Sequence, residues 1–386
     1  MEHKTRIKGN VHYVGVNDRN KHRFEGMWPL PYGVSYNSYL IDDEMVALVD
    51  TVDICYFEVY LRKIKQVIGE RPINYLIINH MEPDHSGSIR LIKQHYPEII
   101  IVGNKQTFGM IEGFYGVTGE QYLVKEGDFL ALGHHKLRFY MTPMVHWPET
   151  MMTFDETDGV LFSGDGFGCF GTVDGGFLDT RINVDKYWGE MVRYYSNIVG
   201  KYGSPVQKAL QKLGGLPISA ICSTHGPVWT ENIAKVIGIY DRLSRYDADE
   251  GVVIAYGSMY GNTEQMAEAI AEELSAQGVK NIVMHNVTKS HPSYIIADIF
   301  RYKGLIIGSP TYSNQIFPEV EALLSKILLR EVKGRYLGYF GSFTWAGAAV
   351  KRLAEFAEKS KFELVGDPVE MKQAMKDLTY TQCENL

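Results

Sequence analysis

Residues 74–85 read Asn74-Tyr-Leu-Ile-Ile-Asn-His80-Met-Glu82-Pro-Asp84-His85. The first part of this segment is a short apolar run, which is typical of a buried strand. The part that follows contains four side chains that can bind a metal ion: His80, Glu82, Asp84 and His85. Because they come directly after a buried strand, we expect them to face a site at the edge of a sheet.

Three further candidates follow apolar segments elsewhere in the first half: His146 in Thr-Pro-Met-Val-His146, Asp165 in Leu-Phe-Ser-Gly-Asp165, and His225 in Cys-Ser-Thr-His225. A single histidine at a strand end is usually a hydrogen-bonded structural residue, and most of the 12 histidines should be of that kind. The candidates differ because all of them can converge on one sheet edge. Together they supply four imidazoles and three carboxylates, enough for two metal ions bridged by Asp165.

The first half of the chain reads as short strands and helices with long loops. We expect a hairpin of residues 37–41 and 46–50, a helix at 57–68, and helices at 185–202 and 205–213. Further expected strands are 74–78, 99–102, 136–141, 151–155, 160–163 and 218–222. The charged run at 242–250 separates two apolar segments, so we predict domains at 1–248 and 249–386.

The second half alternates regularly between strands and helices. Expected strands are 252–256, 282–286, 304–308, 336–341 and 362–365, and expected helices are 263–277, 294–301, 317–329 and 346–359. Such alternation is typical of a doubly wound parallel sheet. Residues 369–386 are expected to form a terminal helix and tail.

Ser258-Met-Tyr-Gly-Asn-Thr263 lies between the first expected strand and helix, where backbone N–H groups and hydroxyls can surround an anion. It lacks the Gly-Lys-Ser/Thr of a P-loop and the dinucleotide glycine pattern, so a single phosphate, as in FMN, fits better. Capping of the helix is the structural alternative. The loops after the third and fourth strands can pack on a flavin ring. The candidate cofactor residues are Ser258, Met259, Tyr260, Gly261, Asn262, Thr263, Ser309, Pro310, Thr311, Tyr312, Asn314, Ser342, Thr344, Trp345 and Gly347.

Composition excludes several classes of protein. The net charge of -7 lacks the basic balance of a nucleic-acid binder or of a protein bound to anionic membranes. No apolar stretch approaches the length of a membrane span, and residues 1–10 are too polar for a signal peptide, so we expect a cytoplasmic protein. The four cysteines form no CxxC pair, which argues against a disulfide framework.

The second half resembles flavodoxin through its loop at 258–263, which implies bound FMN. The first half resembles the metallo-β-lactamase superfamily, whose hydrolases carry His-x-His-x-Asp-His and bind mainly zinc. In this sequence Glu82 replaces the second histidine of that motif. A carboxylate there makes the site harder and more anionic, which favours iron over zinc. The combination resembles the flavodiiron protein family over roughly residues 5 to 365, with an αββα sandwich before the flavodoxin-like domain.

The resemblance implies an enzyme that reduces O2 or NO at two oxo- or hydroxo-bridged non-haem irons. His80, Glu82 and His146 would hold one iron, Asp84, His85 and His225 the other, and Asp165 would bridge them. In some family members the histidine matching His85 turns away. The family also implies a head-to-tail homodimer or a dimer of dimers, and an external electron donor such as rubredoxin. The preference between O2 and NO stays open.

Two alternatives to an oxygen or nitric oxide reductase remain. One is a hydrolase of the lactamase superfamily fused to an electron-transfer module, and the other is an electron carrier or redox sensor. Tyr195 and Trp28 are candidates for lining a gas pocket, with an ordinary core role as the alternative for each.

Overall fold

The computed structural model describes residues 5–386, which form two compact units. One unit contains residues up to Tyr195 together with Ser204–Asp241, and the other contains Ser196–Gly203 together with Arg242–Leu386. The chain therefore passes between the units more than once. The domain boundary at 248/249 stays a prediction.

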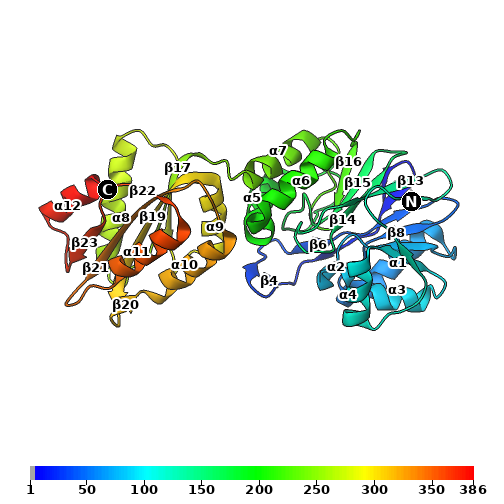
Figure 1. Ribbon diagram of the computed structural model, residues 1–386, viewed down its shortest axis with the longest axis horizontal. Helices are drawn as coiled ribbons and strands as arrows, with labels where there is room; N and C mark the ends of the chain where they lie inside the picture. The colour runs from blue at the N-terminus through cyan, green and yellow to red at the C-terminus, as the bar shows by residue number, and fades with distance from the viewer. Residues whose placement is uncertain (1–4) are drawn as a thin grey trace. The chain divides into compact units, whose positions relative to one another are not determined.

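The first unit is a sandwich of two sheets with helices outside, which confirms the predicted αββα class (Figure 1). One sheet has the order β1-β2-β7-β8-β9-β10-β11, with β1 (Arg6–Lys8), β2 (Val11–Tyr13), β7 (Tyr39–Ile41), β8 (Ala47–Val49), β9 (Tyr75–Ile77), β10 (Ile100–Gly103) and β11 (Gln121–Leu123). The other has the order β12-β13-β14-β15-β16, with β12 (Phe129–Ala131), β13 (Lys136–Met141), β14 (Met151–Asp155), β15 (Val160–Gly164) and β16 (Ala220–Ser223).

Helices flank the sandwich. In Figure 1 α1, α3 and α4 lie on one side of the two sheets and α5, α6 and α7 on the other. Their bounds, with the short α2, are α1 (Phe57–Ile68), α2 (Pro83–Ser86), α3 (Ile89–His95), α4 (Lys105–Tyr115), α5 (Asp185–Tyr194), α6 (Gly203–Leu213) and α7 (Ile233–Ser244). Two small ribbons pair β3 (Val16–Asp18) with β6 (Val34–Tyr36), and β4 (Arg23–Phe24) with β5 (Trp28–Pro29).

The core of this unit lies between the two sheets, where inward side chains of both sheets interlock. Tyr39 of β7 packs on Phe162 of β15 with ring centroids 5.5 Å apart, and both side chains are buried. The predicted hairpin is confirmed as β7 and β8, and α1 has the predicted bounds. Helix α1 buries residues three and four apart, including Tyr60, Ile64 and Ile68, so its amphipathic pattern directs it onto the sheet.

The predicted helix at 185–202 is wrong in its second part. The α-helix ends at Tyr194, and the chain continues as a π-helical turn over Tyr195–Val199 and a 3-10 turn over Gly200–Tyr202. Ser196–Gly203 belongs to the second unit, where Asn197 Nδ2 donates to the Ser293 carbonyl at 3.0 Å. Tertiary packing therefore overrides the local helical pattern.

The second unit has the predicted doubly wound sheet, in the order β18-β17-β19-β21-β22, with parallel pairing along this path. Its strands are β17 (Asp249–Tyr256), β18 (Ile282–Asn286), β19 (Tyr302–Tyr312), β20 (Gln315–Ile316), β21 (Tyr336–Phe343), β22 (Glu363–Leu364) and β23 (Val369–Lys372). Its helices are α8 (Asn262–Ala276), α9 (Pro292–Arg301), α10 (Pro318–Arg330), α11 (Ala349–Ser360) and α12 (Asp377–Glu384). The carboxyl ends of these strands form the edge at which such folds bind ligands.

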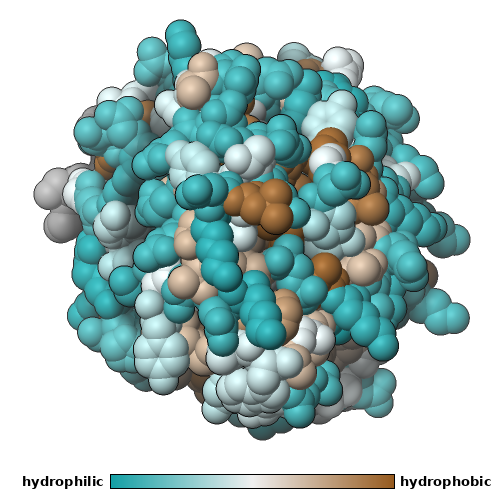
Figure 2. Space-filling view, turned by 90° about the vertical axis from the view of Figure 1, so that its left-hand side faces the viewer, coloured by the Kyte–Doolittle hydropathy of each residue, from teal (hydrophilic) through white to brown (hydrophobic). Residues whose placement is uncertain are grey.

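The end of the chain differs from the predicted helix and tail, because it begins with the strand β23. This strand pairs in parallel with β21, and its residues alternate between buried and exposed. Figure 2 looks onto the second unit from the side of α12, and hydrophobic residues on that face occur in small groups among hydrophilic ones. None of the helices described between residues 5 and 386 combines the length and the apolar character needed to cross a membrane.

Replacing Phe162 with Ala should lower the free energy of unfolding of the first unit by about 3–5 kcal/mol, because a buried ring and its packing are lost. Urea unfolding of the protein, followed by circular dichroism, measures this change. The control is Leu123→Ala on β11, whose side chain is 52% exposed and whose loss should cost within about 0.5 kcal/mol. Equal losses in the two variants would contradict the placement of the core.

Candidate metal centre and flavin cavity

The seven predicted ligands lie together at one edge of the sandwich. His80, Glu82, Asp84 and His85 follow β9, and His146 lies in the loop between β13 and β14. Asp165 follows β15 directly, and His225 lies just after β16. The ligands therefore come from the ends of strands in both sheets, so the sandwich itself sets their separation.

The segment that carries four of the ligands is held by both sheets. Asn79, just before it, donates its backbone N–H and its Nδ2 to the two carboxylate oxygens of Asp50, at 2.8 and 3.0 Å. Thr153 of β14 donates to Asn79 Oδ1 at 2.7 Å. At the far end, the hydroxyl of Thr51 donates to the His85 carbonyl at 2.7 Å. These bonds fix both ends of the loop that presents the ligands.

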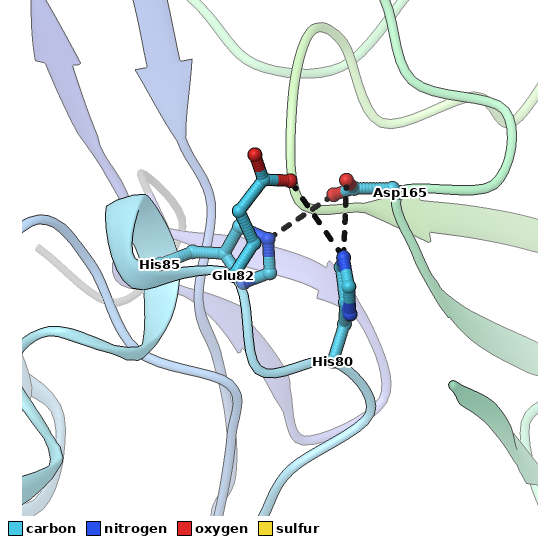
Figure 3. Close-up of side chains that lie close together, drawn as sticks. All are labelled: His80, Glu82, His85 and Asp165. Atoms are coloured by element: carbon cyan, nitrogen blue, oxygen red, sulfur yellow. Dashed lines mark ion pairs between the residues drawn. The ribbon is translucent and has the colours of Figure 1, made fainter. Parts of the chain in front are cut away.

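Asp165 is the centre of the cluster. Its Oδ2 lies 3.0 Å from His146 Nε2 and 3.6 Å from His80 Nε2. Its Oδ1 lies 3.2 Å from His85 Nε2 and 3.6 Å from His225 Nε2. Figure 3 shows His80, Glu82 and His85 facing Asp165 from the segment after β9. Each carboxylate oxygen therefore faces a different pair of imidazoles.

The remaining carboxylates complete two ligand groups. Glu82 Oε2 lies 3.0 Å from His146 Nε2, so Glu82, His80 and His146 form the first ligand group. Asp84 lies 3.4 Å from His225 Nε2 and 3.7 Å from His85 Nε2, so these three residues form the second ligand group. Atoms that surround one ion at roughly 2 Å lie about 3 Å apart, which these separations approach.

Several ligand atoms have no hydrogen-bond partner among the described residues although they are buried. They are Nε2 of His80, His85 and His225, and both carboxylate oxygens of Asp84. An unsatisfied buried polar atom costs about 1–3 kcal/mol, so such a concentration in one place needs a compensating ligand. Metal ions satisfy all of these atoms at once, and the donor set fits them.

Burial and mutual charge shift the pKa values of the cluster in opposite directions. Burial raises the pKa of Asp84 to about 6, and the nearby Glu82 adds to the rise. Burial also acts against ionised Glu82, but hydrogen bonds with His146 and His80 outweigh it and hold the Glu82 pKa at about 2. Both carboxylates are therefore largely ionised near neutral pH, whereas burial is outweighed at His85 by the charges of Asp84 and Asp165, which raise its pKa to about 10, so metal binding must displace a proton from this imidazole.

Two aromatic residues close to the cluster were not predicted. Phe24 and Tyr194 pack on the His225 ring at 5.3 and 5.8 Å between centroids. The hydroxyl of Tyr194 is buried and has no hydrogen-bond partner among the described residues. A cavity of about 390 Å³ reaches Glu82 and Asp84 and is lined also by Phe24 and Glu25.

The predicted pocket residues Trp28 and Tyr195 do not line this cavity. Trp28 is buried and donates its ring N–H to Glu25 at 2.9 Å. Tyr195 is buried against Tyr240, with ring centroids 5.1 Å apart. Both side chains are thus packed in the core, and a place beside a gas pocket stays a prediction for each.

A third group of potential ligands, His135, Asp155 and Asp158, lies apart from the centre. Asp155 of this group is already bonded within a hairpin, since its Oδ2 lies 2.9 Å from His135 Nδ1 and its Oδ1 accepts from the Thr157 backbone at 3.1 Å. We interpret this group as a structural link between β13 and β14.

The second unit has a cavity of about 630 Å³ at the carboxyl ends of its strands. Most of the predicted cofactor residues line it: Ser258, Met259, Tyr260, Asn262, Thr263, Pro310, Thr311, Tyr312, Asn314, Ser342, Thr344 and Trp345. Thr263 at the start of α8 lies with its hydroxyl 2.9 Å from that of Ser342. Tyr260 and Trp345 are 90% and 81% exposed, so their rings are available to a planar ligand.

Gly261, Ser309 and Gly347 are not among the lining residues. Gly261 has a φ of +89°, which lets the chain turn into α8. The Ser309 hydroxyl donates to the Pro310 carbonyl at 3.0 Å and accepts from the Phe317 N–H at 3.2 Å, so it is used within the loop. Five further residues line the cavity: Ser313, Phe343 and Ala346 lie within the predicted loops, whereas Gln373 and Ala374 were not predicted.

Comparison with known proteins gives the same two-part division. A family model described as ODP family beta lactamase matches residues 34–226, and a flavodoxin model matches residues 254–385. An anaerobic nitric oxide reductase flavorubredoxin from Vibrio vulnificus is 32% identical over 363 residues, which cover 92% of this chain and 73% of that relative.

Solved structures agree over almost the whole chain. The rubredoxin oxygen:oxidoreductase of Desulfovibrio gigas matches with a TM-score of 0.93 and 31% identity, over 97% of this chain and 94% of that one. The flavodiiron protein of Giardia intestinalis matches with a TM-score of 0.93 and 28% identity, over 97% and 93%. The two matched domains, their order and the full-length relatives together show that this chain belongs to the flavodiiron protein family.

Proposed function

We propose that this chain is a flavodiiron oxidoreductase, which reduces O2 to water, NO to N2O, or both, with electrons that pass through FMN. The observation that carries the proposal is Asp165, whose two carboxylate oxygens face the two ligand groups separately. A purely structural role does not account for four imidazoles and three carboxylates that are buried together in one place.

Iron suits this set of donors. The first ligand group has a carboxylate, Glu82, where zinc hydrolases of the superfamily place a histidine. Carboxylates are harder donors than imidazoles and favour iron, particularly in its ferric state. His80, Glu82 and His146 would hold one ion, Asp84, His85 and His225 the other, and Asp165 would bridge the pair. Two such irons supply the electrons for reduction of a diatomic gas and a template on which it binds.

Aromatic residues beside the proposed iron pair would form the walls of the site that binds the gas. Phe24 and Tyr194 close one side of the second ligand group with aromatic rings. The buried Tyr194 hydroxyl, free of other partners among residues 5–386, is available to donate a hydrogen bond to a bound gas molecule. Burial keeps its pKa well above the ordinary value, with Asp165 and Glu82 adding to the effect, so Tyr194 retains its proton.

FMN would occupy the cavity of the second unit. Its phosphate fits the start of α8, where backbone N–H groups and the hydroxyls of Ser258 and Thr263 face an anion. Tyr312 and Trp345 are exposed beside the cavity and can flank the isoalloxazine ring. The flavin passes electrons singly or in pairs, which reduction of O2 by four electrons or of two NO by two requires.

The electron donor and the assembly are further parts of the proposal. Rubredoxin or a similar reduced carrier would supply electrons, in keeping with the names of the relatives. The active form would be a head-to-tail homodimer, or a dimer of dimers, in which the flavin of one subunit serves the irons of the other. The protein would work in the cytoplasm, without binding nucleic acid or a membrane.

Anaerobic reduction followed by separate titration with O2 and with NO tests the proposal and ranks the two substrates. We expect reoxidation by at least one gas, with water or N2O as the product. Reduced protein that carries two irons and FMN but consumes neither gas would contradict the proposal. Two bound zinc ions with hydrolysis of a model ester would support the hydrolase instead.

Replacing Asp165 with Ala should abolish gas reduction and lower the iron content, because both ligand groups lose their shared carboxylate. Iron analysis and gas-consumption rates measure the two effects. FMN occupancy serves as the internal control and should stay unchanged. A variant with normal iron content and normal turnover would refute the bridging role.

Replacing Thr263 with Ile should weaken FMN binding by about 10- to 100-fold, the cost of losing a hydrogen bond to a charged group. Fluorescence titration of the apoprotein with FMN measures the affinity. The matched control is Thr288→Ile, an exposed threonine of the same unit that lies outside the cavity lining. Unchanged affinity in the Thr263 variant would count against the phosphate position.

A further inference from the structure

The metal-binding histidines differ in what supports the ring nitrogen that faces away from the metal. His80 Nδ1 lies 2.7 Å from the Glu149 carboxylate. His225 Nδ1 lies 2.8 Å from the backbone carbonyl of Ser35. His85 Nδ1 is buried and has no hydrogen-bond partner in the described part of the chain. Of these three histidines, one is therefore supported by a charged group, one by a neutral group and one by neither.

Glu149 is fixed in this position. Its side chain is fully buried, and its Oε1 accepts a second hydrogen bond from the Met81 backbone at 2.9 Å. Its own carbonyl accepts from Asn104 Nδ2 at 2.5 Å, and Asn104 Oδ1 in turn caps the first turn of α4. The second carboxylate oxygen of Glu149 is buried without a partner. A glutamine in this place would keep the same acceptor without the cost of a buried charge.

We propose that Glu149 is a positioning residue, which holds His80 with Nε2 toward the first ligand group and makes that metal position more electron-rich than the second. The proposal rests on the proposed function, because it assumes a pair of irons. A carboxylate behind a metal-bound imidazole fixes the tautomer and raises the basicity of the ligand. The backbone carbonyl behind His225 orients its ring but adds no net charge.

The consequence is a difference between the two irons. Each ligand group contains one carboxylate of its own, Glu82 in the first and Asp84 in the second, so the difference comes from Glu149, which adds a further negative charge behind His80 only. Negative charge favours the higher oxidation state of a metal, so the iron of the first ligand group is the harder one to reduce. The second ligand group, with His85 unsupported at Nδ1, holds the iron that accepts an electron first.

Glu149→Gln separates this role from support of the loop, because glutamine keeps an oxygen that accepts from Met81 and His80 but removes the charge. The conservative variant Glu149→Asp keeps the charge. The matched control is Asp155→Asn, which removes a buried carboxylate from another histidine, His135, at a similar distance of 2.9 Å. Asp155 contacts none of the seven metal ligands in the first unit as described.

Two measurements are made on the holoprotein and on apoprotein reloaded with Fe²⁺ under anaerobic conditions. Competition with a chelator gives the affinity for each iron, and a reductive titration followed by electron paramagnetic resonance gives the order in which the irons are reduced. We expect Glu149→Gln to bind one iron about 10- to 100-fold more weakly and to reduce that iron at a higher potential. Glu149→Asp should lie closer to the wild type, and Asp155→Asn should match it.

Wild-type affinity and reduction behaviour in Glu149→Gln would overturn the inference. An equal weakening of both irons, not rescued by Glu149→Asp, would also overturn it, since a loop that loses its fold affects both positions. These results are distinct from failure of the proposed function, which appears in the wild-type protein itself as the absence of an iron pair or of gas consumption.

Discussion

The burial of one carboxylate between two groups of imidazoles is the interaction on which this structure depends. Asp165 is fully buried, and it is stable there as an anion because histidines face it from both sides. Its pKa is held well below the ordinary value, since these neighbours outweigh the effect of burial. A fold that buries this carboxylate must therefore place the other metal-binding side chains next to it. The sandwich does so because the strands of both sheets end at the same edge.

The sequence predicted most of this arrangement. Apolar runs followed by polar residues identified the strand ends, and all seven predicted ligands meet in the structure. Alternation of strands and helices predicted the second sheet, and the hydroxyl-rich loop at 258–263 predicted the start of the flavin cavity. These features depend on local pattern and on the rule that parallel strands end together, so they can be read without coordinates.

The features that the sequence did not predict depend on contacts between distant segments. Glu149 looks like any polar residue of a loop, and only the fold places it behind His80. Gln373 and Ala374 reach the cavity because β23 precedes them, and that strand is too short for its alternation to be recognised. The helix predicted at 185–202 changes to π and 3-10 turns in the segment that belongs to the second unit. The conformation of these segments depends on the residues that they pack against and not on their local secondary-structure propensity.

The way in which the chain divides between the two units limits how they can be separated. Ser196–Gly203 belongs to the second unit, although residues on both sides of it belong to the first. A flavodoxin-like fragment beginning at residue 249 would lack the hydrogen bond that Asn197 donates to the Ser293 carbonyl, and it would lack Gly200, where the backbone approaches the Phe300 ring so closely that a Cβ would lie 2.7 Å from it. A single cut of the polypeptide at this position would therefore expose the part of α9 that Asn197 and Gly200 cover. The two units therefore cannot be separated intact by a single cut of the chain.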